Sequence, residues 1–239
     1  AVTEAQVRAV FGRLEHPTRV DATTGERLSL GSRPRTFQSR EERVARALAA
    51  EPDATEERRA EIRNEVYAQT RKAVAYYDLT FSPVKSVSGY WTALLEAGRD
   101  AEAANVVAAH RAGVAAAMAY VEREAAYVRS GYHGKTMSGQ SVGVYEQARG
   151  LAWIRWDHST SRAQQPQLHS HVTVLNRAET TSDGVIRALA SRGFKPIKQA
   201  AEAIYTKVSH ESLAASNGVV FATREDGKAR EILGLTPQL

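Results

Sequence analysis

Three histidines lie close together in the second half of the chain. His158, His169 and His171 fall within 14 positions, although the whole chain has only seven histidines. His169 and His171 are two residues apart in an apolar segment, and side chains of a strand alternate between its faces, so both imidazoles project from the same face. His158 ends the preceding predicted strand, and a hairpin would bring it beside them. Three imidazoles on one sheet face indicate a metal site.

An acidic residue on another predicted strand belongs with these histidines. Asp78, Thr80 and Ser82 share the polar face of an alternating segment at 77–82. If this strand pairs with the segment 168–176, Asp78 accepts a hydrogen bond from an imidazole N–H and orients the ring. A single histidine on a strand is usually structural, and the acid alone fits a turn or a surface position equally well. Burying three imidazoles without a shared partner is costly, however, so the cluster favours a metal.

The chemistry of such a site has two forms. Three neutral ligands leave a divalent ion with its full charge and with open positions. Such an ion can polarise a phosphodiester and neutralise its developing charge. It can also activate a water molecule, as zinc does in hydrolases. The spacing of the histidines does not choose between these forms.

The elements that position these residues follow from periodicity and turn residues. Residues 1–75 are expected to be helical, with an exposed loop between Glu15 and Phe37, and residues 76–239 to form the metal-bearing sheet core of the same single domain. The longest helix is expected between Gly98 and Gly131. Its apolar stripe is Val107, Val114, Val121 and Val128. The other expected elements are strands at 151–157, 168–176 and 185–189, a helix over 196–217, and a hairpin of 219–223 with 231–235. The pattern is α+β, an antiparallel sheet with helices packed on it.

Composition narrows the class of protein. The chain has 239 residues, enough for one large domain, and a formal net charge of +5, which permits a polyanionic partner without requiring one. It has no cysteine, which excludes disulfides, Cys-zinc sites and thiol nucleophiles and suits a cytoplasmic location. No apolar run reaches the length of a membrane span.

Two longer motifs identify a family. Residues 78–88 read DLTFSPVKSVS, residues 157–162 read DHSTSR, and residues 166–171 read PQLHSH. The first resembles the "DLTFSxxKSVS" strand of the MobF-type (TrwC/TraI-like) conjugative relaxases, members of the HUH endonuclease superfamily. The others resemble the three-histidine motif of that family. The resemblance covers roughly residues 77–218; His110, Asn176 and the Asp183-Gly184 pair also fall where the family tends to have them.

The resemblance implies a fold, a cofactor and a reaction. The fold would be the HUH sheet, antiparallel with about five strands. The metal would be Mg²⁺ or Mn²⁺ in the cell, with Zn²⁺ or Ni²⁺ possible in a crystal, held by His158, His169 and His171. The substrate would be single-stranded DNA at a transfer origin, with other conjugation proteins as partners. A tyrosine would attack the scissile phosphate and stay joined to the 5′ end, with Asp78 orienting the site and assisting the tyrosine.

Candidates for DNA contacts are less specific. Lys85 and Arg162 suit backbone phosphates, but each fits a solvated charge equally well, and Thr80 and Ser82 share the polar face of the 77–82 strand. Trp91, Trp153 and Trp156 are possible stacking platforms. Each tryptophan is expected to lie in the core rather than on a DNA-binding surface.

The chain departs from the family in its tyrosines. The family's nucleophilic tyrosines lie well upstream of the "DLTF" strand, whereas the first tyrosine here is Tyr67, in a predicted helix. The tyrosine-bearing first strand is therefore expected to be missing. Tyr77 is expected to be a structural residue of the strand, which leaves Tyr76 as a weaker candidate nucleophile. Gln165 and Ser170 stand where the family commonly has Asp and Thr.

Three functions remain open on the sequence. The first is a relaxase domain, catalytic in its full-length parent. The second is a catalytically incomplete relaxase-like module that binds single-stranded DNA. The third is an unrelated hydrolase with a three-histidine zinc, in which metal-bound water would replace the tyrosine.

Overall fold

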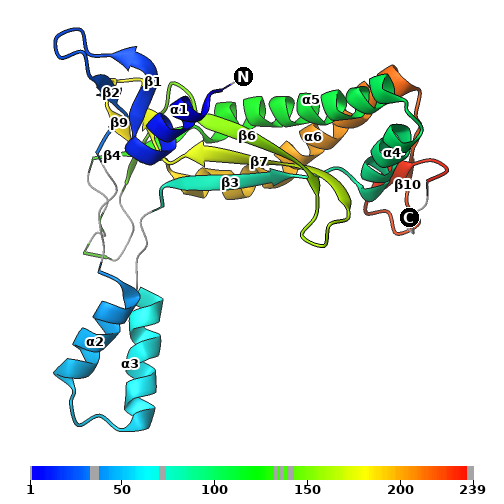
Figure 1. Ribbon diagram of the computed structural model, residues 1–239. Coiled ribbons are helices and arrows are strands. Elements are labelled where there is room, and N and C mark those ends of the chain that lie inside the picture. The colour runs from blue at the N-terminus through cyan, green and yellow to red at the C-terminus, as the bar shows by residue number, and fades with distance from the viewer. Residues whose placement is uncertain are drawn as a thin grey trace. The chain divides into compact units, whose positions relative to one another are not determined.

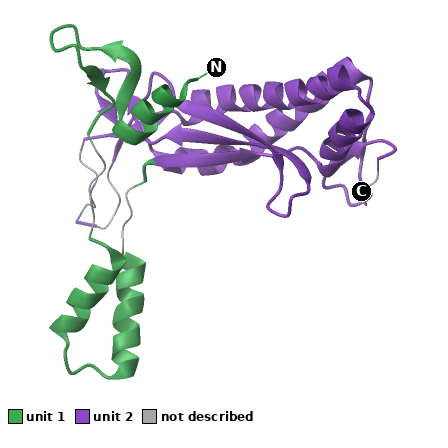
Figure 2. Cartoon of the chain, in the orientation of Figure 1, with its two compact units in different colours: residues 1–75 green, residues 76–239 purple. Residues whose placement is uncertain are grey.

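The chain folds into two compact units, residues 1–75 and residues 76–239 (Figure 2). The computed structural model describes residues 2–32, 38–69, 74–131, 134, 137–138 and 143–235. Among the helices described, none combines the length and the apolar character needed to cross a membrane.

The first unit begins with a short helix and a hairpin. Helix α1 (Glu4–Val7) starts at a capping box, in which Thr3 and Gln6 exchange side-chain and backbone hydrogen bonds. Strands β1 (Glu15–Val20) and β2 (Arg27–Ser29) then pair antiparallel, so the expectation of an exposed loop in this segment is wrong. The segment lacks apolar alternation, and its pairing depends on the turn at Asp21, whose carboxylate accepts from two backbone N–H groups.

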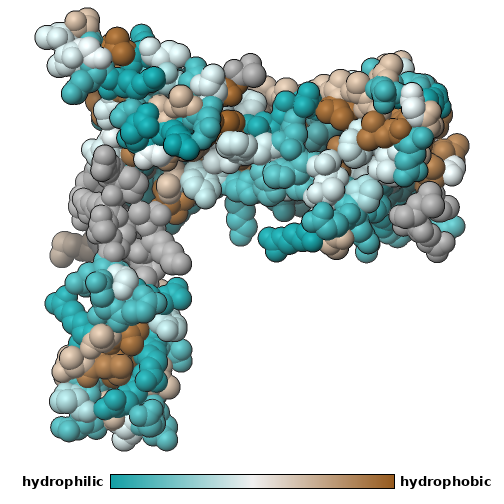
Figure 3. All heavy atoms as spheres, viewed as in Figure 1, coloured by the Kyte–Doolittle hydropathy of each residue, from teal (hydrophilic) through white to brown (hydrophobic). Residues whose placement is uncertain are grey.

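Two charged helices complete the described part of the first unit. Helix α2 (Arg40–Ala50) begins at a second capping box, at Ser39, and helix α3 (Glu56–Gln69) follows after a short turn. Arg58 forms ion pairs with Glu51, Glu61 and Glu65 on the outer surface of this pair. Figure 3 shows apolar atoms gathered in one strip of the helical pair, with polar side chains on either side. Within this helical pair Ile62 of α3 is buried, and α2 has no buried residue.

The second unit is built around an antiparallel sheet. Strands β3 (Tyr76–Phe81), β7 (Pro166–Leu175) and β6 (Trp153–Thr160) lie in the order β3-β7-β6 (Figure 1). The alternating segments thus form strands and pair as expected, and the α+β antiparallel class is confirmed. The count differs, because in the part of the chain that the structure describes this sheet has three strands and not five.

Two long helices cover one face of this sheet. Helices α5 (Asp100–Ala125) and α6 (Phe194–Asn217) pack closely together and against the sheet (Figure 1). The shared core is closed by fully or almost fully buried side chains of α5, α6 and β7, namely Val114, Ala117, Met118, Tyr205, Val172 and Val174. The helices approach closely at Gly113, where a side-chain carbon in place of the hydrogen would lie 2.7 Å from the carbonyl oxygen of Tyr205. The opposite face of the sheet is left for polar side chains.

The long helix ends earlier than its apolar stripe predicts. Val128 lies in strand β4 (Tyr127–Ser130), which pairs with β5 (Val144–Gln147). Val128 is fully buried there, so a spacing of seven residues does not distinguish a helix that continues from a strand that follows it. The β-branched and aromatic side chains of this segment favour the strand. Two short strands, β8 (Ala178–Glu179) and β9 (Ile186–Arg187), pair with each other beside β4.

A second core closes the far end of the unit. Helix α6 stops at Gly218, which adopts a left-handed conformation with φ of 70°. Strands β10 (Phe221–Thr223) and β11 (Arg230–Ile232) form the expected hairpin, with narrower bounds. This hairpin packs on α4 (Lys85–Glu96), a helix that the sequence pattern did not predict.

Candidate metal centre

The structure brings the three histidines together on the open face of the sheet. His169 and His171 alternate along β7 with Ser170 and Val172, which are fully buried under the helices. His158 lies on β6 directly opposite His169. The ring centroids are separated by 5.0 Å for His158 and His169, 5.4 Å for His158 and His171, and 5.3 Å for His169 and His171. The three rings thus form one cluster.

Hydrogen bonds fix which nitrogen two of these rings can offer. Asp78 lies on the neighbouring strand β3, and its Oδ2 is 2.7 Å from Nδ1 of His171. Because a carboxylate can only accept, Nδ1 carries the hydrogen and donates it. Nδ1 of His169 donates in the same way to the carbonyl oxygen of Gln167, at 3.1 Å. Each neutral ring therefore keeps the lone pair of Nε2 for a ligand.

The rings do not yet point at one ion. His158 and His169 are stacked with an angle of 19° between their planes, and His171 stands edge-on to both. Within the ranges that the structure describes, no group of three or more His, Cys, Asp or Glu side chains is arranged to hold a metal as the side chains stand. The three rings therefore form a cluster of donors and not a closed metal site as they stand. The donor set and the tautomers fit a divalent metal.

A chain of hydrogen bonds lies behind the histidines, on the helix side of the sheet; its members His110, Ser170 and Tyr205 are buried, and its last member, Asp157, is open to solvent. His110 of α5 is 2.8 Å from Tyr205 Oη through Nδ1 and 2.7 Å from Ser170 Oγ through Nε2. Ser170 Oγ donates in turn to Asp157, at 2.6 Å. From the sequence, His110 stands out only by its family position, and nothing in the spacing of these residues reveals the chain.

Burial, and for Asp157 also hydrogen bonds and nearby charges, shift the pKa values of these residues. Burial lowers the pKa of His110 to about 4 and raises that of Tyr205. Partial burial alone would raise the pKa of Asp157, but the hydrogen bond from Ser170 and the charges of Arg155 and Arg111 outweigh it, and the net shift is downward. Asp157 is therefore the anionic end of the chain.

The predicted DNA contacts lie around the same face or near its end. Thr80 is paired with His171 in the sheet register, and its hydroxyl is 3.3 Å from Nδ1 of that ring. Lys85 begins helix α4, and its ammonium donates to the carbonyl oxygen of Pro166 at 3.1 Å. Arg162 is exposed in the connection between β6 and β7. Ser82 accepts a hydrogen bond from the Gln167 side chain at 3.3 Å.

The tryptophans divide between core and surface. Trp91 and Trp153 are partly buried against the two apolar cores, as expected. Trp156 is different: it is 43% exposed, and its indole N–H donates to Thr173 on the open face. The expectation that it lies in the core is wrong. The alternation that places His158 on this face also places Trp156 there, two residues earlier, and that pattern could have revealed it.

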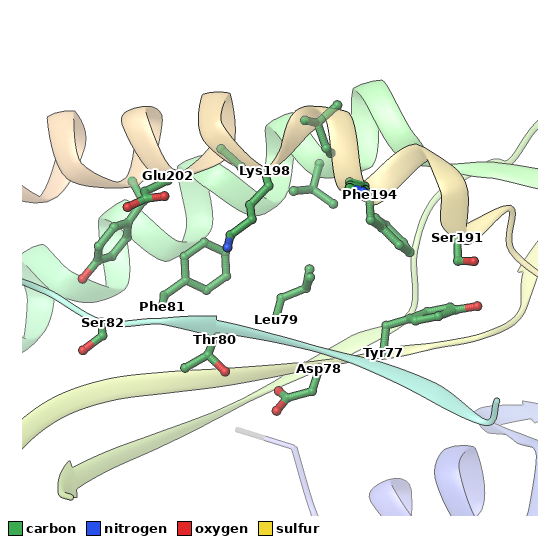
Figure 4. Close-up of a pocket in the computed structure, with 15 residues that line it drawn as sticks. Tyr77, Asp78, Leu79, Thr80, Phe81, Ser82, Ser191, Phe194, Lys198 and Glu202 are labelled. Carbon is green, nitrogen blue, oxygen red and sulfur yellow. The ribbon is translucent and has the colours of Figure 1, made fainter. Parts of the chain in front are cut away.

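The two tyrosines before Asp78 lie on opposite faces of β3. Tyr77 turns toward the helices, with its ring centroid 5.3 Å from that of Phe194. Together with Leu79 and Phe81 it lines a cavity of about 760 Å³ below α6, and Figure 4 shows these side chains pointing away from Asp78. Tyr76 is 56% exposed. Tyr77 therefore has the structural position expected for it.

An antiparallel sheet that carries helices on one face and a histidine cluster on the other defines a relaxase fold. The chain belongs to the TrwC relaxase family, whose sequence profile matches residues 1–239. No curated protein sequence is similar enough to count as a match.

Three solved structures with a similar fold are complexes with DNA. The conjugative relaxase TrwC bound to mutant oriT DNA is 29% identical, with a TM-score of 0.57 over 70% of this chain and 54% of that one. A copper-bound complex of TrwC with oriT DNA is 30% identical, with a TM-score of 0.56 over 69% of this chain and 50% of that one. TrwC with a 27-mer containing the recognition hairpin and the cleavage site shares the fold at 23% identity and a TM-score of 0.54, over 84% and 73% of the two chains. This chain thus spans about half the length of the first two structures.

Proposed function

We propose that this chain is the metal-bearing part of a relaxase that nicks and rejoins single-stranded DNA at a transfer origin in the cytoplasm. The observation that carries the proposal is the cluster of His158, His169 and His171, with ring centroids 5.0–5.4 Å apart and with Asp78 bonded to one of the rings. Membership of the TrwC relaxase family supports DNA as the substrate class of this site.

The three histidines would hold a divalent metal, Mg²⁺ or Mn²⁺, through their Nε2 atoms. Two similar structures are described as metal-bound and copper-bound, which supports a metal here without choosing the ion. When bound, the ion supplies positive charge at the scissile phosphate. Asp78 and the Gln167 carbonyl hold two of the imidazoles in the tautomer that binding needs.

The DNA strand would cross the open face of the sheet. Trp156 exposes its indole there and can stack on a base, while Lys85 and Arg162 can contact phosphates. The similar solved structures contain oriT DNA, which supports single-stranded DNA as the ligand. Other conjugation proteins would deliver the substrate.

The cleavage step requires a tyrosine. The phenol would give up its proton as its oxygen attacks phosphorus, the bond from phosphorus to the 3′ oxygen would break, and the 3′ oxygen would take up one proton; the reverse reaction rejoins the strand. Tyr77 is turned to the other face of the sheet and packs on Phe194, so it does not suit this role. Tyr76, on the face of β3 that carries Asp78 and 56% exposed, remains the weaker candidate nucleophile. If it does not attack, the chain by itself binds metal and DNA without cleavage, which is the second candidate function.

Metal titration tests the proposal. Mn²⁺ added to the full 239-residue chain should bind, and His169→Ala should abolish most of the heat of binding in calorimetry. His16→Ala removes a histidine from the first unit and should leave binding intact, which makes it the matched control. Retained Mn²⁺ affinity in His169→Ala would contradict the proposed site. A covalent protein–DNA adduct on a denaturing gel would separate a cleaving relaxase from a module that only binds DNA.

A further inference from the structure

The polar chain under the sheet has a direction that chemistry fixes. The Asp157 carboxylate can only accept, so the Ser170 hydroxyl donates its hydrogen to Asp157. The Ser170 oxygen must then accept from Nε2–H of His110, and the remaining nitrogen of that neutral ring must accept from the Tyr205 hydroxyl. The chain therefore runs Tyr205 to His110 to Ser170 to Asp157, with each link a donor to the next. The low pKa of His110, about 4 because of burial, agrees with the neutral ring.

Two members of this hydrogen-bonded series belong to the strands that carry the histidines. Ser170 lies between His169 and His171 on β7, and Asp157 directly precedes His158 on β6. Neighbouring residues of a strand share their backbone, so fixing a side chain on one face also fixes where its neighbours leave the other face. The hydrogen-bonded series thus anchors β6 and β7 to α5 and α6 at the level of the histidines.

Ser170 is the polar residue among the helix-facing side chains of this part of β7. The helix-facing residues of β7 around it are Leu168, Val172 and Val174, all of them apolar and buried. Ser170 is fully buried among them, where a hydroxyl without partners would be costly. An apolar residue would fill the core equally well but would lack directional bonds. A complete network of hydrogen bonds specifies one geometry more sharply than apolar packing does.

We propose that His110, Ser170 and Tyr205 are positioning residues that set the spacing of the three histidines for metal binding. The proposal rests on the proposed function, because it assumes that the cluster holds a metal. Each of the three acts through the strands and touches neither metal nor DNA. Their contribution should therefore appear in the affinity for the metal, beyond any contribution to the stability of the fold.

The test compares metal affinity with stability in the full chain. Ser170→Ala removes the central link, and Tyr205→Phe removes only the terminal hydroxyl and keeps the ring beside Phe81. Each should weaken Mn²⁺ binding severalfold by calorimetry, up to roughly the tenfold at the low end for groups bonded directly to a metal ligand, because these residues act only through the strands. Ser170→Thr keeps the hydroxyl and should restore the affinity. Val128→Ala, a buried position on β4, should lower the midpoint of thermal unfolding and leave Mn²⁺ binding unchanged.

The outcomes separate this proposal from the metal site itself. Wild-type affinity in both Ser170→Ala and Tyr205→Phe would overturn the positioning role, as would an equal loss of affinity in Val128→Ala. If Ser170→Ala does not fold, Tyr205→Phe decides, because the ring it keeps maintains the core. If the wild type binds no Mn²⁺, or if His169→Ala still binds it, the metal site is wrong and the positioning role is overturned with it.

Discussion

Single residues decide which ring nitrogen two of the three histidines can offer to a ligand. Asp78 holds Nδ1 of His171 and so leaves Nε2 as the free donor, while a backbone carbonyl does the same for His169. A carboxylate also makes the bound imidazole more basic, which a neutral carbonyl does only weakly. The acid on β3 is therefore the side chain with the largest expected influence on the proposed metal, among those outside the three histidines.

Asp78→Asn should weaken Mn²⁺ binding on the order of tenfold, because the amide lacks the charge that holds the His171 N–H. Calorimetric titration of the full chain measures the change. Asp183→Asn is the matched control, since Asp183 pairs with Arg187 away from the cluster and should not alter the affinity. An unchanged affinity in Asp78→Asn would show that the carboxylate does not support the metal site.

Two buried histidines make the stability of the fold depend on pH. Burial lowers the pKa of His110 and of His210 from the ordinary 6.5 to about 4. Around His110, the charge of Asp157 opposes this shift, and those of Arg155, His169 and Arg111 add to it. Between pH 6.5 and 4 these two histidines bind protons in the unfolded chain but remain neutral in the folded chain. The contribution of these two histidines to the free energy of unfolding should therefore be highest above pH 6.5, fall as the pH drops toward 4, and level off below.

Each histidine contributes a slope of about 1.4 kcal/mol per pH unit inside this window, as an upper bound for one proton. His110→Asn and His210→Asn should each remove one histidine's share of the slope of the free energy of unfolding against pH. Urea unfolding at several pH values between 4 and 7 measures it. Only His110→Asn should also weaken Mn²⁺ binding, since His210 stacks on Phe221 away from the cluster. Equal slopes in the wild type and in both variants would exclude these histidines as the cause.

At the scale of elements, the sequence predicted the parts in which one face is buried. The alternation at 76–81 and 166–175 follows from a sheet with helices on one side and polar groups on the other, so the strands and the shared face of the histidines could be predicted, whereas the register could not. The β1–β2 hairpin could not be predicted, because its strands bury little side-chain surface and their pairing depends on a turn. Helix α4 was missed because its Ser, Val and Gly residues have weak helix propensity, and it is held by packing on the second core.

The packing of α5 on α6 depends on the absence of a side chain at Gly113. A methyl group there would lie 2.7 Å from the Tyr205 carbonyl oxygen and 2.9 Å from Ser209 Cβ, and the backbone atom cannot move aside alone. Gly113→Ala should destabilise the second unit by about 1–3 kcal/mol, despite the better helix propensity of alanine. Urea unfolding measures the change.

Gly89 in α4 provides the control for this substitution. It is also helical, but no atom lies within 4 Å of the corresponding methyl position. Gly89→Ala should be neutral or stabilising by up to about 1 kcal/mol. If both variants had the same stability, helix propensity alone would explain the result, and the close approach of the two helices would have no energetic consequence.

At the scale of the whole molecule, charge and surface should govern binding to DNA. The chain carries a formal net charge of +5 and a pI near 9.5. Contacts to phosphates release counterions, so their number sets how steeply the affinity falls with salt. Stacking on an aromatic ring adds affinity that is far less sensitive to salt. The two kinds of contact can therefore be separated by measuring affinity over a range of salt concentrations.

Fluorescence anisotropy with a single-stranded oligo(dT) probe tests this separation. Lys85→Ala and Arg162→Ala should each reduce the slope of log affinity against log salt by about 0.7, the value for one lost phosphate contact on a single strand. Trp156→Ala should weaken binding by about 1–3 kcal/mol with the slope unchanged. Lys207→Ala is the control, since this exposed lysine of α6 pairs with Glu211 and lies on the helix that covers the other face. If Lys207→Ala changed the slope as much as Arg162→Ala, the strand would be held by net charge and not by the face that carries the histidines.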